Sequence, residues 1–308
     1  MKLVSVVVLC CLLFVDLGVA SNRSGSVTGL FLKLPLNARA VGMGGAQAAT
    51  ASGVTSIPFN PAGMMSVAQY GFGASYTQWF ADVQFSYFGA IANMGDLGTF
   101  GASVTMLATD DMIETTPGYP EGTGQYFRAS DYAFSIAYAR QVTDQFMIGV
   151  DGKFIQSYLY NTEYGTSSFA VDIGSLYDIP VLKSRIGVSL TNIGPDLKFI
   201  NETYSLPTSL RFGILTDVLK TDNQSVVATL QINRLNDSDE QYNIGTEYMF
   251  NNMFALRGGW KFAYDQESYT FGAGLSLSPV GINGMLDYGY NNFKFLPSTH
   301  SFTFDLQF

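Results

Sequence analysis

The sequence predicts an all-β protein: a transmembrane antiparallel β-barrel of about fourteen strands, preceded by a short, partly helical segment. Composition is the first reason, because only 13% of the residues are charged and 14% are aromatic, whereas a soluble domain usually has about a quarter charged residues. The second is that no stretch after residue 20 is apolar for long enough to span a membrane as a helix. The third is that apolar and polar residues alternate along most of the chain, as the two faces of a strand require.

Residues 1–20 are expected to be a secretory signal peptide, removed near Ala20. Lys2 precedes an apolar run over 3–15, and Gly18 and Ala20 are small residues of the kind that signal peptidase needs. A transmembrane helix is the alternative, but the run is shorter than the ~20 apolar residues that a span requires. Both cysteines of the chain lie inside this segment, so the mature protein can form no disulfide.

Residues 21–68 do not alternate and are expected to form a separate, hatch-like segment. Small residues dominate 38–51, and Asn60-Pro61 is a turn signal, so a short helix of small residues is predicted. The glycine-rich run Gly42-Met43-Gly44-Gly45 resembles a dinucleotide-binding loop. No strand precedes it and no βαβ unit follows, so that interpretation is set aside.

Residues 69–308 are predicted to form the barrel, from alternating segments close to the ~10 residues that a tilted strand needs. The segments begin near residue 70 and continue at 83–94, 97–108, 132–140, 146–157, 169–177, 186–192, 210–218, 226–232, 242–250, 253–264, 269–277, 282–290 and 300–308. Short turns alternate with longer connections, of which 109–128 is the longest. In such barrels the longer loops face outside.

Alternation assigns apolar side chains to the lipid and charged side chains to the lumen. The outward set includes Phe134, Ile136, Tyr138, Phe169, Val171, Ile173, Tyr269, Phe271, Ala273, Leu275 and Leu277. The inward set includes Asp151, Lys153, Asp172, Arg211, Glu247, Arg257, Lys261, Asp287 and Asp305. Ionised groups at membrane depth are costly unless they face water or a partner. Since both signs are present, the interior is predicted to be partly closed by ion pairs and not to be a strongly ion-selective pore.

Glycine is frequent on the predicted inner face. The positions are Gly71, Gly73, Gly101, Gly149, Gly213, Gly245, Gly272 and Gly274. A strand glycine lets another backbone approach closely. The predicted occupant of this room is the segment 21–68.

The carboxyl terminus places Phe302, Phe304, Leu306 and Phe308 on one face of the last strand. Ending on such a phenylalanine is typical of bacterial outer-membrane barrels, in which the last strand is the signal read by the insertion machinery. Phe304, Leu306 and Phe308 are therefore the predicted insertion signal. An edge strand of a soluble sandwich is the alternative, but it does not explain the same alternation elsewhere. The expected location is the outer membrane, with its lipid and the insertion machinery as partners.

Catalysis and nucleic-acid binding are not expected. The net charge of −9 opposes binding to phosphates, which needs a basic surface. His300 is the only histidine, so no Ser/His/Asp arrangement can be built without it, and a rim or lumen position is expected for it. Trp79 and Trp260 are interpreted as interfacial girdle residues. No enzymatic activity, cofactor or metal site is predicted.

Particular motifs resemble the PorV/PorQ family, which is related to the FadL long-chain fatty acid transporters. The resemblance is carried by Ala38-Arg39-Ala40-x-Gly42-Met43-Gly44-x-Ala46, the alanine-rich 48–51, and Asn60-Pro61-Ala62-Gly63 just before the first strand. The matched residues are Arg39, Gly42, Gly44, Ala46, Asn60, Pro61 and Ala62. The segments 76–83 and 299–302 also look familial. The resemblance implies a fourteen-stranded barrel with an amino-terminal hatch.

The same resemblance implies a function in type IX secretion or surface protein assembly. PorV-like members bind the carboxy-terminal signal of secreted cargo, so secretion-system components or cargo are the expected partners. The relationship to FadL implies an alternative, the transport of small hydrophobic molecules across the outer membrane. That alternative predicts an apolar pocket between residues 30–65 and the inner wall.

Overall fold

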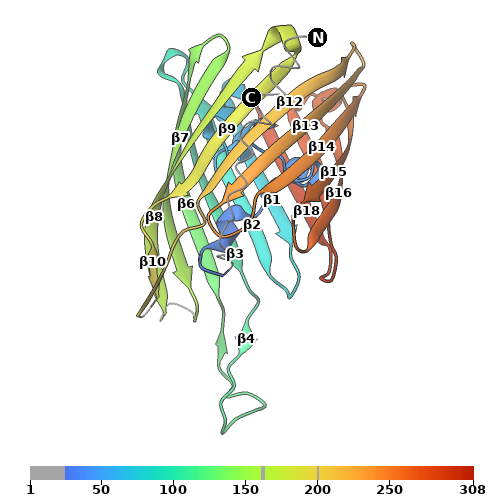
Figure 1. Ribbon diagram of the computed structural model, residues 1–308. Helices are drawn as coiled ribbons and strands as arrows, with labels where there is room; N and C mark the ends of the chain where they lie inside the picture. Colours follow the sequence, from blue (N-terminus) through green and yellow to red (C-terminus); the bar gives the residue numbers. More distant parts are fainter. Residues whose placement is uncertain (1–24, 161–163, 200) are drawn as a thin grey trace.

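A computed structural model describes residues 25–160, 164–199 and 201–308, so the predicted signal peptide lies outside the described residues. Within them, fourteen strands form a closed barrel in which every strand is antiparallel to its neighbours (Figure 1). They are β1 (Tyr70–Gln78), β2 (Gln84–Asn93), β3 (Thr99–Ala108), β6 (Ser130–Thr143), β7 (Phe146–Tyr158), β8 (Gly165–Ile179), β9 (Ser184–Ile193), β12 (Ser209–Lys220), β13 (Gln224–Leu235), β14 (Gln241–Phe250), β15 (Phe254–Phe262), β16 (Glu267–Ser276), β17 (Gly284–Phe293) and β18 (Thr299–Gln307). The predicted fold class is confirmed, and each predicted segment overlaps one of these strands.

The barrel closes where its first strand, β1, pairs with its last strand, β18. The register runs from Gly71 opposite Gln307 to Gln78 opposite His300. Beyond it, the amide of Phe308 donates to the carbonyl of Tyr70 over 2.9 Å, and the amide of Tyr70 donates back over 3.2 Å. Closure leaves no unpaired sheet edge, which no span in hydrocarbon could tolerate.

The two faces of the strands follow the predicted alternation. On β8, Phe169 and Ile173 are 64% and 51% exposed, whereas Asp172 between them is fully buried. Ile136 on β6 is 78% exposed. One outward prediction is wrong: Leu277 lies beyond the end of β16, in the turn that leads into the 3₁₀ helix η6 (Ser278–Val280), where a strand's alternation no longer applies.

The connections differ at the two ends of the barrel. The short-turn rim carries the turns between β2 and β3, β6 and β7, β8 and β9, β12 and β13, β14 and β15, and β16 and β17. Three of these turns contain 3₁₀ helices, namely η4 (Gly95–Leu97), η5 (Pro180–Leu182) and η6. The long-loop rim carries two hairpins, β4 (Met112–Ile113) with β5 (Tyr126–Phe127), and β10 (Leu197–Phe199) with β11 (Glu202–Tyr204). The β4–β5 arm projects well beyond the barrel (Figure 1). These hairpins were not predicted, because two or three residues are too few to show alternation.

Residues 25–68, which we call the luminal segment, lie inside the barrel. The segment contains η1 (Leu30–Lys33), α2 (Ala38–Gly42), η2 (Val54–Ser56) and η3 (Pro61–Ser66). It starts at the long-loop rim, where the amide of Thr28 donates to the carbonyl of Ser205. It ends at the short-turn rim, where Gln69 accepts from the amide of Asn93. No helix in the described part of the chain is long and apolar enough to cross a membrane.

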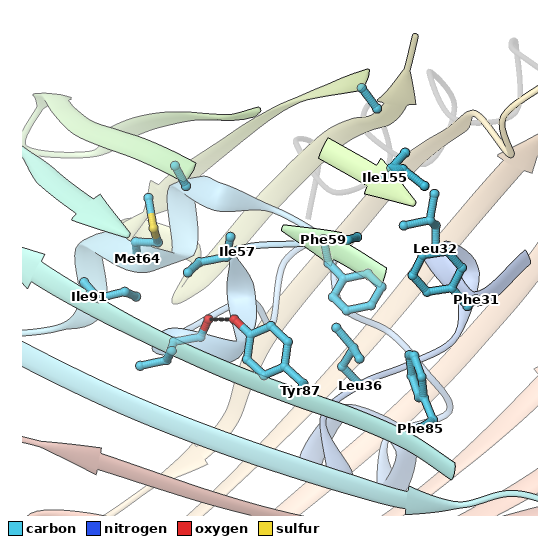
Figure 2. Packing of buried hydrophobic residues seen from close by; sticks show 14 of the residues in the cluster. Phe31, Leu32, Leu36, Ile57, Phe59, Met64, Phe85, Tyr87, Ile91 and Ile155 are labelled. Carbon is cyan, nitrogen blue, oxygen red and sulfur yellow. Dashed lines mark hydrogen bonds between the residues drawn. The ribbon is translucent and has the colours of Figure 1, made fainter. Parts of the chain in front are cut away.

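An apolar core joins the luminal segment to one side of the barrel. Figure 2 shows Phe31, Leu36, Ile57, Phe59 and Met64 of the segment packed towards the strand residues Phe85, Tyr87, Ile91 and Ile155. The hydroxyl of Tyr87 donates to the carbonyl of Val54 over 2.7 Å. We call this side, formed by β2, β6 and β7, the apolar wall. Burial of large side chains here anchors the segment without charge, since apolar surface removed from water stabilises by roughly 25 cal/mol per Å².

Candidate functional site

The opposite side of the luminal segment faces a charged wall, formed by β12–β18. Its centre is Glu247 on β14, which binds two arginines. Arg39 of α2 donates through Nε and Nη2 to both carboxylate oxygens of Glu247, over 2.9 and 2.8 Å. Arg257 of β15 donates to Glu247 over 2.6 Å and to Asp287 of β17 over 2.7 Å. The neighbouring Glu247 raises the pKa of Arg39 above its usual value, so the guanidinium stays charged.

The geometry of α2 presents Arg39 to this cluster. Asn37 caps the helix, because its side-chain oxygen accepts from the amides of Arg39 and Ala40 over 2.7 and 3.3 Å. Its Nδ2 donates to Thr55, which ties the two halves of the segment together. The amide of Ala38 donates to Thr303 of β18 over 2.9 Å. The start of the helix is therefore fixed by its own cap, Asn37, and by Thr303, a strand side chain that points inwards.

The glycines of the matched motif allow the backbone to touch the wall. A Cβ at Gly42 would lie 2.9 Å from the Cα of Gly272. Gly44 has a φ of +72°, which favours glycine, and its amide donates to Thr270 of β16 over 3.0 Å. Its carbonyl accepts from Asn243 of β14 over 2.5 Å. Ala46 follows, 1% exposed, where its carbonyl accepts from Thr50.

The Asn60-Pro61-Ala62 motif packs against β7 and β8. Asn60 is fully buried, and its Nδ2 donates to the carbonyls of Ala48 and Ser175 over 2.7 and 3.1 Å. Pro61 and Ala62 lie over Gly149, where an added Cβ would come within 2.5 Å of their backbone. Seven of the eight inner-face glycines named from the sequence face atoms of the luminal segment; the eighth, Gly274, faces Arg257 and Asp287 instead.

The predicted luminal charges separate into distinct groups. Lys153 of β7 pairs with Asp172 of β8 over 2.6 Å and donates to Asn192 over 3.0 Å. A left-handed φ of 61° at Asn192 turns its amide towards Asp172, 2.7 Å away. Asp151, fully buried beside them, accepts from Ser135 over 2.9 Å. Lys261 of β15 pairs with Glu267 of β16 over 2.7 Å.

Arg211 of β12 differs from the other luminal cations named from the sequence, which are paired with carboxylates. No carboxylate oxygen of the described residues lies within 4.0 Å of Arg211. Its Nη1 donates to Thr191 over 2.9 Å, and its guanidinium lies over the ring of Phe59, 5.4 Å from the centroid.

Three cavities adjoin the luminal segment; the first and third also border the charged wall, and the second is lined by the segment alone. The first, of about 200 Å³, is lined by Arg211, Gln47 and Lys261 near the long-loop rim. The second is only about 20 Å³ and shares Gln47 and Phe59 with the first. The third, of about 230 Å³, contains Arg39, Glu247 and Asp305 near the short-turn rim. A cavity as small as the second holds little more than one water molecule, for which roughly 10–15 Å³ suffices.

An apolar groove of about 650 Å³ opens at the long-loop rim. Its apolar side chains come from the start of the luminal segment and from the surrounding strands and hairpins: Val27, Leu30, Phe31, Leu34, Trp79, Leu107, Leu159 and Phe199. Leu30 and Leu159 are 52% and 53% exposed. The FadL-like alternative predicted an apolar pocket between residues 30–65 and the inner wall. The groove borders only the first residues of that segment. Most of the segment faces the polar, charged wall on its other side.

The sequence-based list omitted several uncharged groups that hold the luminal segment. Gln231 of β13 accepts from the amides of Gln47 and Ala48 over 2.7 and 2.6 Å. Asn243 donates to the carbonyl of Gly44, and the hydroxyls of Thr270 and Thr303 accept from backbone amides of the segment. All four strand residues occupy inward positions, so the alternation that located the charges could also have found them.

His300 and the carboxy-terminal residues lie on the outer face. The Nδ1 of His300 is 2.8 Å from the hydroxyl of Tyr288, and the ring lies among outward aromatic side chains near the long-loop rim. Phe304 and Phe308, 40% and 61% exposed, point towards the lipid. Trp260 is 48% exposed beside Tyr269, and Trp79 packs at the rim against Phe293.

These features define an outer-membrane β-barrel whose lumen is occupied by its own amino-terminal segment. The family model described as "Type IX secretion system protein PorV" matches residues 19–239. The chain belongs to the PorV family, and it is an outer-membrane barrel of type IX secretion. A comparison with curated proteins finds no match.

Solved structures of FadL-like barrels are similar in fold. The toluene transporter TbuX of Ralstonia pickettii has a TM-score of 0.65 and 15% identity, over 90% of this chain and 99% of that one. The toluene transporter TodX of Pseudomonas putida has a TM-score of 0.61 and 12% identity, over 92% and 98%. A FadL homologue of Pseudomonas aeruginosa has a TM-score of 0.54 and 8% identity, over 89% and 98%. Family and fold are those of outer-membrane barrels and transporters, not of enzymes.

Proposed function

We propose that this protein handles cargo for type IX secretion as a closed barrel that presents its long-loop rim to secreted proteins. The apolar groove at that rim carries the proposal. It combines exposed Leu30 and Leu159 with the aromatic ring of Trp79, which is the composition of a protein-binding surface. The luminal segment supports a role in presentation, because it occupies the lumen and the two cavities between it and the charged wall, of about 200 and 230 Å³, are far too small for a polypeptide.

The luminal segment and the last strand have defined roles in this proposal. Residues 21–68 act as the hatch, with Arg39, Gly42, Gly44, Ala46, Asn60, Pro61 and Ala62 as the residues that seat it. Residues 69–308 form the barrel, and Phe304, Leu306 and Phe308 are the insertion signal. The mature chain begins after Ala20. Its partners are outer-membrane lipid, the insertion machinery, secretion components and secreted cargo.

Replacement of Leu30 and Leu159 by glutamate tests the groove. In cells lacking the chromosomal copy, the double variant is expected to leave secreted cargo in the periplasm and to lower the cargo recovered with the barrel by about tenfold. Charged groups cannot be buried against an apolar partner without a large desolvation cost. The measurement is quantitative mass spectrometry of surface, periplasmic and co-purified fractions.

The matched control is Val181→Glu at the short-turn rim, where Val181 is 93% exposed. It should secrete and bind as the unmodified chain does. Normal secretion and cargo recovery by the double variant would rule the groove out as the cargo site.

Transport of small hydrophobic molecules is the second candidate function. The apolar groove favours it, because a small hydrophobic molecule that approaches the long-loop rim would meet this groove first. The charged side chains that line the first and third inner cavities oppose it, because an apolar molecule on its way to the short-turn rim would have to displace water from them. Toluene or fatty acid uptake that depends on this barrel, with secretion intact in its absence, would establish this alternative.

A further inference from the structure

The cavity nearest the long-loop rim has the features of a binding site. Its volume of about 200 Å³ is many times that needed for one water molecule, which is roughly 10–15 Å³. Lys33, Gln241 and Tyr264, all partly exposed, lie on the side of the cavity nearest the rim. The cavity therefore lies next to solvent at that rim.

The cationic groups that line this cavity are not equivalent. Lys33 is neutralised by Asp237 over 2.7 Å, and Lys261 by Glu267 over 2.7 Å. Arg211 lines the same cavity, is only 5% exposed, and has no carboxylate of the described residues within 4.0 Å. A buried ion is costly unless it is paired, so this position calls for a counter-ion.

A second buried group in the cavity also lacks a partner. Gln47 is 6% exposed, and neither atom of its side-chain amide makes a hydrogen bond among the described residues. Its backbone is fixed, because the backbone N–H of Gln47 donates to the side-chain oxygen of Gln231 over 2.7 Å. Buried polar atoms are nearly always hydrogen-bonded, so the free amide indicates a ligand that supplies the missing bonds.

The nearest acidic residues do not account for Arg211. Asp172 influences it through space, but that carboxylate is already paired with Lys153 over 2.6 Å and accepts the amide of Asn192. Asp151, beside Asp172, is held by Ser135. Neither carboxylate lies within 4.0 Å of Arg211, so neither neutralises it directly.

We propose that Arg211 and Gln47 form a binding site for a small oxyanion, a short organic carboxylate or phosphate, that enters from the long-loop rim. The planar fork of the guanidinium matches two oxygens of such a group. The side-chain amides of Gln47 and Gln241 suit further polar groups of the ligand, and Phe59 and Leu235 suit a short carbon skeleton. This site is independent of the secretion role.

Calorimetric titration of the purified full chain tests the proposal, with succinate and glutamate as carboxylate probes and inorganic phosphate as the other. The unmodified protein should bind at least one probe saturably. Arg211→Gln should weaken that binding by about tenfold or more, because hydrogen bonds to charged groups are the strong ones. Arg211→Lys, which keeps the charge and loses the fork, should give an intermediate affinity.

Arg185→Gln on the neighbouring strand β9 is the control, since Arg185 pairs with Asp178 away from the cavity. It should bind as the unmodified chain does. Binding of succinate or glutamate without phosphate identifies a carboxylate site, and the reverse a phosphate site. If Arg211→Gln fails to assemble, Gln47→Leu replaces it as the test variant. Because it removes the side-chain amide assigned to the ligand, it should also weaken binding of the probe. Absence of saturable binding for all three probes, or an unchanged affinity in these variants, overturns the proposal.

Discussion

Glu247 holds together parts of the chain that are far apart in sequence. It accepts from Arg39, 208 residues away, and from Arg257 on the adjacent strand. All three side chains are largely shielded from water; Arg257 is completely so. At this depth an ion pair is useful only if every partner is present, because removal of one leaves an uncompensated charge.

Replacement of Glu247 by glutamine is expected to loosen the luminal segment from the charged wall. Two arginines lose their shared counter-ion, and breaking a buried pair typically costs about 3–5 kcal/mol. The expected result is faster hydrogen exchange at residues 38–46 and a lower unfolding temperature, measured by mass spectrometry and by circular dichroism in detergent.

The control for this change is Asp178→Asn, which removes the partly exposed pair with Arg185. Pairs of that kind contribute about 0–1 kcal/mol. A Glu247→Gln protein as stable and as protected as the Asp178→Asn protein would show that the cluster does not hold the segment.

At the scale of elements, α2 docks on the barrel through backbone contacts that only glycine allows. Gly42 of the helix and Gly272 of β16 meet with their Cα atoms adjacent, with no side chain between them. The sequence indicated room on the inner face, but it did not say which wall α2 would choose. That choice depends on Thr270 of β16 and on Asn243 and Glu247 of β14, which the pairing of β14, β15 and β16 places on one inner surface.

Gly272→Ala is expected to displace α2 from the wall. The added Cβ would lie 3.0 Å from the Cα of Gly42, and overpacking of this kind costs about 1–3 kcal/mol. Limited proteolysis of the folded barrel should show earlier cleavage within the luminal segment.

Gly258→Ala on β15 is the matched change, because a Cβ at Gly258 meets nothing within 4 Å. It should leave the cleavage pattern and stability unchanged. If both alanine variants behave alike, close backbone approach is not what seats the helix.

For the whole molecule, closure of the barrel and filling of the lumen depend on each other. The luminal segment divides the interior into an apolar wall, which anchors it, and a charged wall, along which water-accessible cavities remain. Such a division needs both the segment and a complete ring of strands. The pairing of β1 with β18 completes the ring, and the two bonds between Phe308 and Tyr70 extend that pairing to the last residue.

Phe308→Ser is therefore expected to reduce the amount of assembled barrel several-fold, because the outward ring at the closing strand is lost. The measurement is the fraction of heat-modifiable protein in the outer membrane. The mass of the purified mature chain, from the same preparation, tests cleavage after Ala20. Phe295→Ser, at an 85% exposed position on the long-loop rim, is the control and should assemble normally. Equal assembly of the two variants would show that the last residue is not part of the signal.

The sequence by itself determined the barrel, a count of about fourteen strands, the direction of nearly every strand side chain and the absence of alternation before the first strand. These properties are local, since alternation of period two can be read without knowing which strands are neighbours. Only the tertiary structure decided which charges pair, which inward glycines meet α2, and that Arg211 is left without a carboxylate. Those outcomes depend on distances between strands far apart in the chain, and such distances are set by closure, not by any local pattern.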